Sequence, residues 1–513
     1  MNVADYLLEK CSNLDKDFVV GTKETISYKE LLNKVNKLAS HLYADLGTGK
    51  EIMLLSENNV FFIVSYLSII KSGNVVVLLD TKISENDLKN ILEKCSISAF
   101  FVQDKFQGKL DLNKKICTEA ILENLPEGKN EFKIETKDED TAEIIFTSGS
   151  TGEKKGVMLT HKNIRANTES ILEYQGLTEN DRIEVVLPFF YCYGLSLLHT
   201  HLRAHGSIVL NDSIFLGSVI NEIRKYHCTG FAGVPSTYQI LINKTNFLEQ
   251  DFPSLRYLAQ AGGKLANNSI LKIADAFTQK LFFVMYGATE ATSRLSYLPP
   301  QLVKEKLGSI GKGISGVKLE VRDANGKPIK PNEVGEIVAA GDNITKGYYK
   351  DLEATNKVLN NGWYSTGDLA TIDDDGFIYI VGRLSSIIKS AGFRITPFEI
   401  EDVVVSLDGV LNCAVMGMPD DIMGEAVIAV VEAKEPTKEL KDKITSHCNR
   451  VLPSYKVPKN IVFIDKIPLN SSSKMDRNKI KEILMSKTNH VNTDQKHNAT
   501  GIDYLSSDLI LIK

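Results

Sequence analysis

Several features that mark particular classes of protein are missing from this sequence of 513 residues. There is no surplus of basic residues, since the formal net charge is -5, which argues against a general nucleic-acid binder. The longest apolar run, Val60 to Ile70, is too short to cross a bilayer and predicts a buried helix. The first residues include acidic side chains and no long apolar stretch, so we expect no secretory signal. We therefore expect neither a membrane span nor a nucleic-acid partner.

Cysteine pairs are also missing. The seven cysteines are scattered along the chain, form no CxxC pair and are odd in number. Disulfide frameworks and zinc sites usually show cysteines at short, repeated spacings. Scattered free thiols are typical of a reducing compartment, and we expect a cytoplasmic location.

The chain is long enough for two or more domains, and its apolar and charged content is ordinary for a globular protein. From about residue 28 to 290, short apolar runs alternate with longer helical patterns, which is typical of parallel strands between helices. The predicted strands are Ile97–Val102, Glu143–Phe146, Ile183–Leu187, Ser207–Leu210, Leu255–Ala259 and Leu281–Met285, and the predicted helices include Asn163–Tyr174, Leu216–Tyr226 and Ser236–Ile242.

The pattern changes after residue 315. Strand-like runs with Asn325-Gly326 and Asp375-Gly376 turns predict a small antiparallel β subdomain. From Thr396 onward, Pro397 can begin a helix, and shorter strands and a helix over Lys438–Val451 follow. We predict an α/β fold with a large N-terminal domain of sheet layers, a small β subdomain and a smaller α+β C-terminal domain.

The segment FTSGSTGEKKGV, from Phe146 to Val157, combines hydroxyls, glycines and lysines directly after a predicted strand. Closely spaced backbone N–H groups and hydroxyls are the donors that polyphosphate oxygens need. Gly149, Gly152 and Gly156 let the backbone approach a ligand, and Lys155 adds positive charge. The spacing of a Walker A loop is not present. The segment predicts a phosphate-binding loop, with a flexible surface turn as the alternative.

A second glycine motif, Gly311-Lys-Gly313-Ile-Ser-Gly316, fits the GxGxxG pattern of dinucleotide sites. Such a site needs a helix after the glycines, whereas the following VKLEVRD alternates like a strand. We predict a turn here and no dehydrogenase site.

Three further segments carry polar side chains with suitable chemistry. Tyr286-Gly-Ala-Thr-Glu290 offers an aromatic face, a hydroxyl and a carboxylate at a predicted strand end, suited to a base, a phosphate and magnesium. Asp368 and Arg383 flank a predicted hairpin and can hydrogen-bond to ribose hydroxyls and phosphate. Lys474 lies in a loop of small residues. Taken singly, each also fits an ordinary loop or surface residue.

Seven segments in one order resemble the adenylate-forming superfamily, which includes acyl-CoA synthetases, adenylation domains of nonribosomal peptide synthesis and beetle luciferases. They are FTSGSTGEKKGV, AGGKL, YGATE, STGD, DGFIYIVGR, IKSAGFRITPFEIE and SSSKMDR. The resemblance extends from about Tyr28 to Leu484. It implies that a carboxylic acid and MgATP form an acyl-adenylate with release of pyrophosphate, and that a pantetheine thiol then takes the acyl group.

The resemblance implies a role for each matching residue. Tyr286, with Gly287 next to it, stacks on the adenine, and Asp368 holds the ribose hydroxyls with the help of Arg383. The adenine is bracketed on its other side by Ala261, Gly262 and Gly263. The phosphate loop comprises Thr147, Ser148, Gly149, Ser150, Thr151, Gly152 and Lys155.

Further roles concern the reaction itself. The resemblance implies that Thr289 contacts the α-phosphate, that Glu290 binds magnesium, and that Lys474 bridges the substrate carboxylate and the α-phosphate. Gly392 resembles the residue that meets the pantetheine arm in the second half-reaction. Lysine and magnesium make physical sense there, because a carboxylate attacking a phosphate brings two anions together.

The resemblance also implies a mobile C-terminal domain. Residues 1–382 would form the N-terminal adenylate-forming domain, 383–386 the hinge, 387–485 the C-terminal mobile domain and 486–513 a tail extension. The mobile domain would bring Lys474 in for adenylation and the Gly392 loop in for thioester formation.

The sequence departs from the family pattern in three segments. Serines occupy 385 and 386 in the hinge, and Ser473 replaces the glycine usual before the catalytic lysine. Where many acyl-CoA synthetases read LPxFHxxGL, this chain has Tyr191 in place of the histidine, which alters the acid pocket or its gate.

These motifs contain no Asp of the kind that amino-acid-activating relatives pair with an α-ammonium, so we expect an uncharged acyl or aryl acid, with an amino acid as the alternative. The acceptor is CoA or an acyl or peptidyl carrier protein, because both present the same pantetheine thiol. No feature favours luciferase-like oxidation. A non-catalytic nucleotide-binding homologue would be favoured by loss of Lys474 or Glu290, and both are present.

Overall fold

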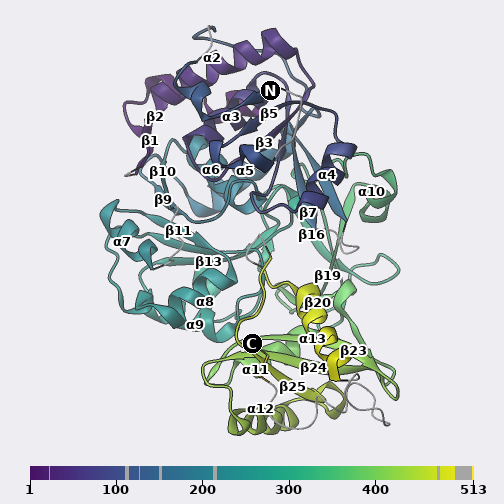
Figure 1. Ribbon diagram of the computed structural model, residues 1–513. Coiled ribbons are helices and arrows are strands. Elements are labelled where there is room, and N and C mark those ends of the chain that lie inside the picture. The colour runs from purple at the N-terminus through teal and green to yellow at the C-terminus, as the bar shows by residue number, and fades with distance from the viewer. Residues whose placement is uncertain are drawn as a thin grey trace.

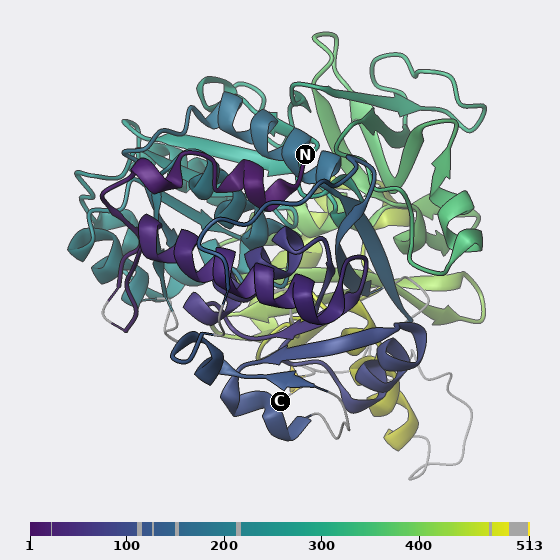
Figure 2. The same ribbon diagram turned by 90° about the horizontal axis from the view of Figure 1, so that it is seen from above.

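The structure is a computed structural model that describes residues 1–21, 23–109, 115–125, 128–148, 153–211, 217–470, 474–491 and 511–512. Four sheets, each with its own helices, make up the fold. Figures 1 and 2 show the first layer in purple and blue, most of the second in teal, the third in green and the C-terminal layer in light green and yellow.

The first sheet has the strand order β6-β5-β3-β4-β7-β8, and all its pairs are parallel except the β7–β8 hairpin. Its strands are β3 (Glu51–Leu55), β4 (Val75–Leu78), β5 (Ile97–Val102), β6 (Ile116–Cys117), β7 (Thr141–Ser148) and β8 (Lys154–Thr160). The helical segments of this layer are α1 (Val3–Leu7), η1 (Cys11–Asn13), α2 (Tyr28–Leu46), α3 (Val60–Lys71), α4 (Glu85–Lys94), η2 (Asp104–Lys109) and η3 (Glu119–Leu122). Every residue of α3 is buried, as expected for a helix that is apolar on all sides.

The second sheet has nine strands in the order β15-β14-β13-β12-β11-β9-β10-β1-β2, and its six central strands are parallel. They are β1 (Asp17–Val19), β2 (Ile26–Ser27), β9 (Arg182–Val185), β10 (Ser207–Leu210), β11 (Gly230–Gly233), β12 (Tyr257–Gln260), β13 (Leu281–Tyr286), β14 (Ser296–Leu298) and β15 (Lys312–Gly313). The helical segments of this layer are α5 (His161–Gln175), α6 (Cys192–Arg203), α7 (Ser218–Lys225), α8 (Pro235–Lys244), η4 (Phe247–Glu249), α9 (Asn267–Ala276), η5 (Thr289–Ala291) and η6 (Pro300–Leu302).

The third sheet is antiparallel, with the order β16-β17-β19-β18 and β20 also paired to β19. Its elements are β16 (Val317–Arg322), β17 (Gly335–Gly341), α10 (Leu352–Val358), β18 (Leu359–Asn360), β19 (Trp363–Ile372) and β20 (Ile378–Arg383). Gly326 and Gly376 have φ of 77°, which a turn at these positions requires. The GxGxxG segment contributes β15 and leads into the strand β16, so no helix follows the glycines.

The fourth sheet has the order β22-β21-β24-β25-β26, with β23 paired to β24. Its elements are η7 (Leu384–Ser386), β21 (Ile388–Ser390), β22 (Phe393–Ile395), α11 (Pro397–Val405), β23 (Val410–Asp420), β24 (Gly424–Ala433), α12 (Lys438–Val451), η8 (Ser454–Lys456), β25 (Asn460–Ile464), α13 (Arg477–Val491) and β26 (Leu511–Ile512). Near the chain end, β26 adds a parallel edge strand beside β25. No helix within the described part of the chain is both long and apolar enough to span a membrane.

A buried chain of three polar side chains joins the first two layers. The Tyr66 hydroxyl of α3 donates to Oε2 of Glu143 on β7 at 2.7 Å and lies 2.7 Å from Nε2 of His199 on α6. Burial lowers the pKa of His199 to about 3, so the ring is neutral. Burial raises the pKa of Glu143 to about 7.

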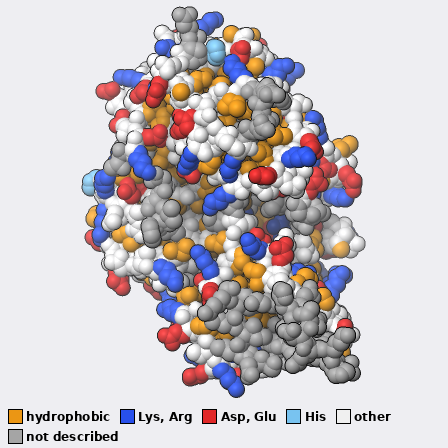
Figure 3. Space-filling view, viewed as in Figure 1, with side chains coloured by type: hydrophobic (Ala, Val, Ile, Leu, Met, Phe, Trp, Pro, Cys, Tyr) orange, Lys and Arg blue, Asp and Glu red, His pale blue; other side chains and the backbone are white. Residues whose placement is uncertain are grey.

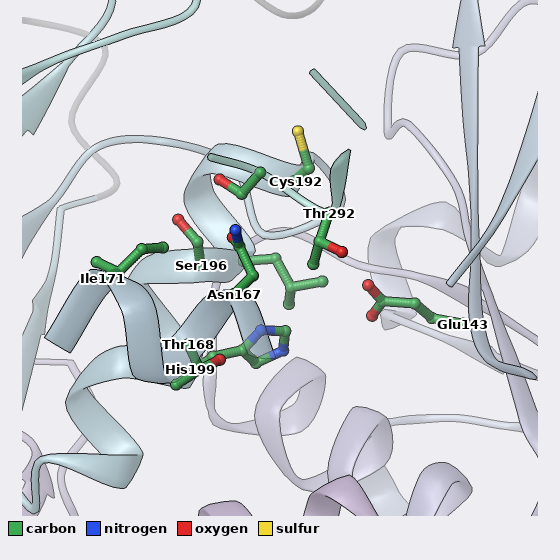
Figure 4. A pocket seen from close by; sticks show the side chains of 10 residues that line it. Glu143, Asn167, Thr168, Ile171, Cys192, Ser196, His199 and Thr292 are labelled. Carbon is green, nitrogen blue, oxygen red and sulfur yellow. The ribbon is translucent and has the colours of Figure 1, made fainter. Parts of the chain in front are cut away.

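Glu143 and His199 also line a small buried cavity between the layers (Figure 4). Its volume is about 10 Å³, which is room for roughly one water molecule. Thr292, Ser293 and Cys192 line it as well, so the cavity lies beside residues that follow the YGATE segment and begin α6.

We predict that this buried carboxyl makes stability fall as the pH rises. The pKa of Glu143 rises from 4.5 to about 7 on folding, so the folded chain keeps a proton that the unfolded chain has already released. The stabilising contribution is complete below pH 4.5 and is lost as the pH rises through 7. Glu143→Gln keeps an acceptor for Tyr66 but cannot ionise. We compare the free energies of unfolding of the variant and the wild type, measured with urea. The difference should shift in favour of the variant by up to about 3 kcal/mol between pH 5 and pH 8. A constant difference across this range contradicts the prediction.

Candidate active site

Lys474 brings the C-terminal part of the chain to the N-terminal layers. Its ammonium nitrogen lies 5.1 Å from the ring centroid of Tyr191, which immediately precedes α6. Its Cε lies 3.6 Å from the position that a Cβ on Gly262 would take. The side chain of Asn470 accepts a hydrogen bond of 3.0 Å from the Lys474 backbone N–H. The predicted catalytic lysine therefore lies against the start of α6 and the end of β12.

The surroundings of Lys474 favour its charged form. Burial has the largest effect on the pKa of Lys474 and lowers it, but the combined opposing effects of Tyr191 and Cys192 leave this pKa raised. Burial raises the pKa of Tyr191 as well, so a neutral ring faces the ammonium at neutral pH. Such a cation–π contact holds a cation without neutralising it. The ammonium remains available to an anionic ligand.

A second contact between the two parts of the chain lies nearby. Lys264, which follows the AGG segment, forms an ion pair of 2.6 Å with Asp402 of α11. The same ammonium lies 5.6 Å from the ring centroid of Phe398. These contacts accompany the pose in which Lys474 meets Tyr191.

Three of the residues predicted for adenine and ribose, Tyr286, Asp368 and Arg383, form one cluster. The Tyr286 hydroxyl, at the end of β13, donates to Oδ2 of Asp368 at 2.6 Å. Nε of Arg383 lies 3.4 Å from Oδ1 of Asp368, because the two residues are cross-strand partners on β19 and β20. Burial raises the pKa of Asp368, against the opposing effects of Arg383 and the Tyr286 hydrogen bond. The Arg383 side chain is 55% exposed and accessible to a ligand.

Glu290 and Lys155 are joined through Tyr348. The Tyr348 hydroxyl donates to Oε1 of Glu290 at 2.8 Å, and Nζ of Lys155 lies 5.2 Å from the Tyr348 ring centroid. The backbone N–H of Thr345 donates to the Glu290 carbonyl at 2.8 Å. Among the described residues no three His, Cys, Asp or Glu gather into a metal cluster. One carboxylate beside a lysine that is predicted to bind phosphate still fits Mg²⁺, which keeps its waters and binds phosphate oxygens.

Thr289 is buried and contacts α6. Its Oγ1 lies 3.4 Å from Sγ of Cys192, the first residue of that helix. The preceding turn is tight, since a Cβ on Gly287 would come within 1.8 Å of the Ser293 carbonyl oxygen. A glycine is therefore required at 287 for this segment to bring Thr289 and Glu290 to the site.

The predicted phosphate loop differs in part from the structure. Thr147 and Ser148 belong to β7 and Lys155 to β8, with Thr147 and Lys155 as cross-strand partners, so the prediction of a loop at these positions was wrong. The reason is that strand pairing continues beyond Phe146. Gly149, Ser150, Thr151, Gly152 and also Ser473 lie outside the described residues.

The remaining predicted residues lie at two places. Ala261, Gly262 and Gly263 follow β12, and Gly262 has a φ of 89° and lies near Lys474. Gly392 is exposed between β21 and β22 with a φ of 84°. Within the described part of the chain, no contact joins Gly392 to the Lys474 cluster.

Three residues at the site were not found from the sequence. Tyr348 bridges Glu290 and Lys155, and Cys192 contacts Thr289. Arg294 is only 2% exposed and lies over the Tyr193 ring. Aromatic, sulfur-containing and single basic residues are common in any chain, so no sequence pattern singles these positions out.

Comparisons with known proteins agree with this geometry. Residues 10–349 match the family model described as AMP-binding enzyme, and residues 399–474 match the model of its C-terminal domain. The chain belongs to this AMP-binding enzyme family. The resemblance to adenylate-forming enzymes and the predicted α/β fold are thereby confirmed, as is the predicted enzyme class of AMP-forming acid–thiol ligases.

Individual relatives cover nearly the whole chain. A 2-succinylbenzoate–CoA ligase of Bacillus pumilus is 32% identical over 465 residues, 89% of this chain and 92% of the relative. A feruloyl-CoA synthase of Amycolatopsis is 30% identical over 466 residues, 89% and 93% of the two chains. The solved o-succinylbenzoate CoA synthetase of Bacillus subtilis with its acyl-adenylate intermediate is 27% identical, with a TM-score of 0.84, over 93% of this chain and 98% of that one.

We predict that the Tyr191 ring holds the Lys474 ammonium in place for acid activation. Tyr191→Leu removes the ring and should slow acid-dependent pyrophosphate release about tenfold, since a cation–π contact contributes about 1–2 kcal/mol. Tyr191→Phe keeps the ring and should retain most of the rate. Release is measured at saturating ATP, with Tyr43→Leu on the exposed face of α2 as the control. Equal losses in the Leu and Phe variants would show that the ring is not what positions the lysine.

Proposed function

We propose that this protein converts a carboxylic acid and MgATP into an acyl-adenylate and pyrophosphate, and then transfers the acyl group to the thiol of CoA. The observation that carries this proposal is the meeting of Lys474 with Tyr191 and Gly262, across the boundary between the C-terminal and N-terminal parts of the chain. A single pose thus joins a cation to the residues around Thr289, Glu290 and Asp368.

In the first half-reaction, the Lys474 ammonium bridges the reacting carboxylate and the α-phosphate. Two anions approach each other there, and a preorganised cation stabilises the charge that develops in the transition state. The Thr289 hydroxyl donates a hydrogen bond to the α-phosphate. Lys155 and the hairpin between β7 and β8 hold the outer phosphates, which leave together as pyrophosphate.

The nucleoside is held at the other side of the site. Tyr286 offers its ring to the adenine, with Gly262 and its neighbours on the opposite face. Asp368 accepts hydrogen bonds from the ribose hydroxyls, and the exposed Arg383 guanidinium donates to the sugar or phosphate. The Glu290 carboxylate would hold magnesium, which would neutralise charge at the phosphate oxygens.

The second half-reaction needs a different pose. Gly392 is exposed and outside the Lys474 cluster, so the C-terminal domain, residues 387–485, must rotate about a hinge at 383–386 to bring the Gly392 turn to the pantetheine arm. The serines at 385 and 386 lie in the short helical turn η7, which suits a connection that changes direction.

The acceptor and the location complete the proposal. CoA is favoured as the acceptor because the relatives are named as CoA ligases and synthetases, while a carrier protein presents the same thiol. All seven cysteines are unpaired and buried, which supports a cytoplasmic, reducing location.

We predict that Lys474 is needed for adenylation and not for thioester formation. Lys474→Ala should lower acid-dependent pyrophosphate release by roughly 10²–10³, the usual cost of losing one preorganised donor. With a preformed acyl-adenylate and CoA, the same variant should form the thioester at close to the wild-type rate, because the lysine is then outside the site.

The matched control is Lys466→Ala, an exposed lysine in the same region, which should behave as wild type in both assays. Repeating the thioester assay with candidate carrier proteins decides the acceptor, and including α-amino acids tests the amino-acid alternative. If Lys474→Ala loses both half-reactions equally, the proposed exchange of poses is wrong.

A further inference from the structure

Arg294 is the largest side chain that is fully buried in the described part of the protein, with 2% of its surface exposed. It lies between η5 and β14, shortly after Glu290. Two asparagines fix its backbone: Nδ2 of Asn167 and Nδ2 of Asn343 donate to its carbonyl at 2.9 and 3.0 Å. Oδ1 of Asn167 accepts from its N–H at 3.2 Å. The backbone of Arg294 is therefore anchored to Asn167 and Asn343, and its side chain is buried.

The charge of Arg294 is not balanced by the residues around it. No carboxylate of the described residues lies within ion-pair distance of its guanidinium, and its Nε has no hydrogen-bond partner. Its neighbours are the Tyr193 ring, whose centroid lies 4.8 Å from the guanidinium carbon, and the Tyr174 phenol, whose pKa Arg294 lowers against the effect of burial. Burial raises the pKa of both tyrosines, so both are neutral.

Six of the other arginines are paired with a carboxylate. A carboxylate lies within 4 Å of each of Arg165, Arg203, Arg256, Arg322, Arg383 and Arg477, all of which are more exposed than Arg294. Among the described residues Arg182, Arg224, Arg394 and Arg450 have none, and Nε of Arg182 also lacks a hydrogen-bond partner, but none of these four is buried as Arg294 is. An arginine stays charged inside a protein, and a buried charge without a partner is strongly destabilising. The position therefore lacks one anion.

The location of Arg294 indicates where this anion comes from. Three consecutive residues at the start of α6 face the site: Tyr191 contacts Lys474, Cys192 contacts Thr289, and Tyr193 contacts Arg294. Tyr191 and Tyr193 are two residues apart, so their Cα atoms are separated by less than about 8 Å. Lys474, Arg294 and Glu290 all act electrostatically on the Cys192 thiol. Arg294 thus lies next to the reaction centre, on its inner side.

We propose that Arg294 binds a second carboxylate of the acid substrate, so that the protein activates a dicarboxylic acid. This inference rests on the proposed function and specifies its substrate. One carboxylate of the acid meets Lys474 and reacts, and the other forms a paired, bidentate hydrogen bond with the Arg294 guanidinium. A planar guanidinium matches a planar carboxylate better than it matches a hydroxyl or an amide.

The proposal revises the expectation of an uncharged acyl or aryl tail. An acid without a second charge leaves the buried guanidinium unpaired, and an α-ammonium would be repelled by it. The absence of an Asp partner for an ammonium, noted in the motifs, fits both an uncharged and an anionic tail. Arg294 separates these two possibilities.

The test uses wild-type protein and pairs of acids that differ only in charge. Each dicarboxylic acid, from four to ten carbons and including aromatic examples, is compared with its own monomethyl ester in a pyrophosphate-release assay. For the true substrate, kcat/KM should be at least about 100-fold higher for the diacid than for the half-ester. Half-esters or simple monocarboxylic acids that react as well as the diacids overturn this inference and leave the proposed function standing. No pyrophosphate with any acid overturns both.

The Arg294→Gln variant then tests whether Arg294 causes the preference for the diacid over its half-ester. The ratio of kcat/KM for diacid to half-ester should fall from about 100 to near 1, and Arg294→Lys should keep an intermediate ratio. An unchanged ratio, with both acids slowed equally, means that Arg294 is only structural and overturns the inference. If Arg294→Gln does not fold, the inference is tested on the wild-type protein by measuring the change in its Tm when adenylate analogues bind. A sulfamoyl-adenosine analogue of the diacid should raise Tm more than that of the half-ester, and equal shifts overturn the inference.

Discussion

Like charges must be brought together and neutralised for an acid to attack a nucleotide, and the Lys474 ammonium meets this requirement only in a particular arrangement of the chain. The lysine belongs to the C-terminal part, while Tyr191, Gly262 and Thr289 belong to the N-terminal layers. The ion pair of Lys264 with Asp402 crosses the same boundary. The surface between the two parts therefore belongs to the proposed site, and the proposed domain rotation would separate it between the two half-reactions.

Much of the fold could be predicted because hydrophobic patterns report it directly. The apolar run from Val60 to Ile70 is a buried helix, and the alternation between residues 28 and 290 corresponds to parallel strands with helices between them. The glycine turns at 326 and 376 occur where predicted. The division into domains at 382 and 386 and the roles of the individual site residues stay predictions, since they depend on motion and on ligands.

The rest could not be predicted because it depends on contacts between distant segments. Nothing near Tyr348 in the sequence indicates that it joins Glu290 to Lys155. Arg294 looks like any surface arginine until the structure shows it buried without a carboxylate beside it. The sequence predicts a loop at Thr147 and Lys155 because this segment is rich in glycine and serine. In the structure, the pairing of β7 with β8 includes both residues. The face in Figure 3, where acidic and basic side chains are interspersed, likewise gives no hint of the buried charges.

Isotope exchange between pyrophosphate and ATP, catalysed by the wild-type protein, tests the central claim most directly. The exchange reports reversible attack of an acid on the α-phosphate without depending on the acceptor thiol. We expect exchange that requires both magnesium and an acid and that stops when either is omitted. Absence of exchange with every acid, or cleavage of ATP to ADP and phosphate instead, would contradict the account.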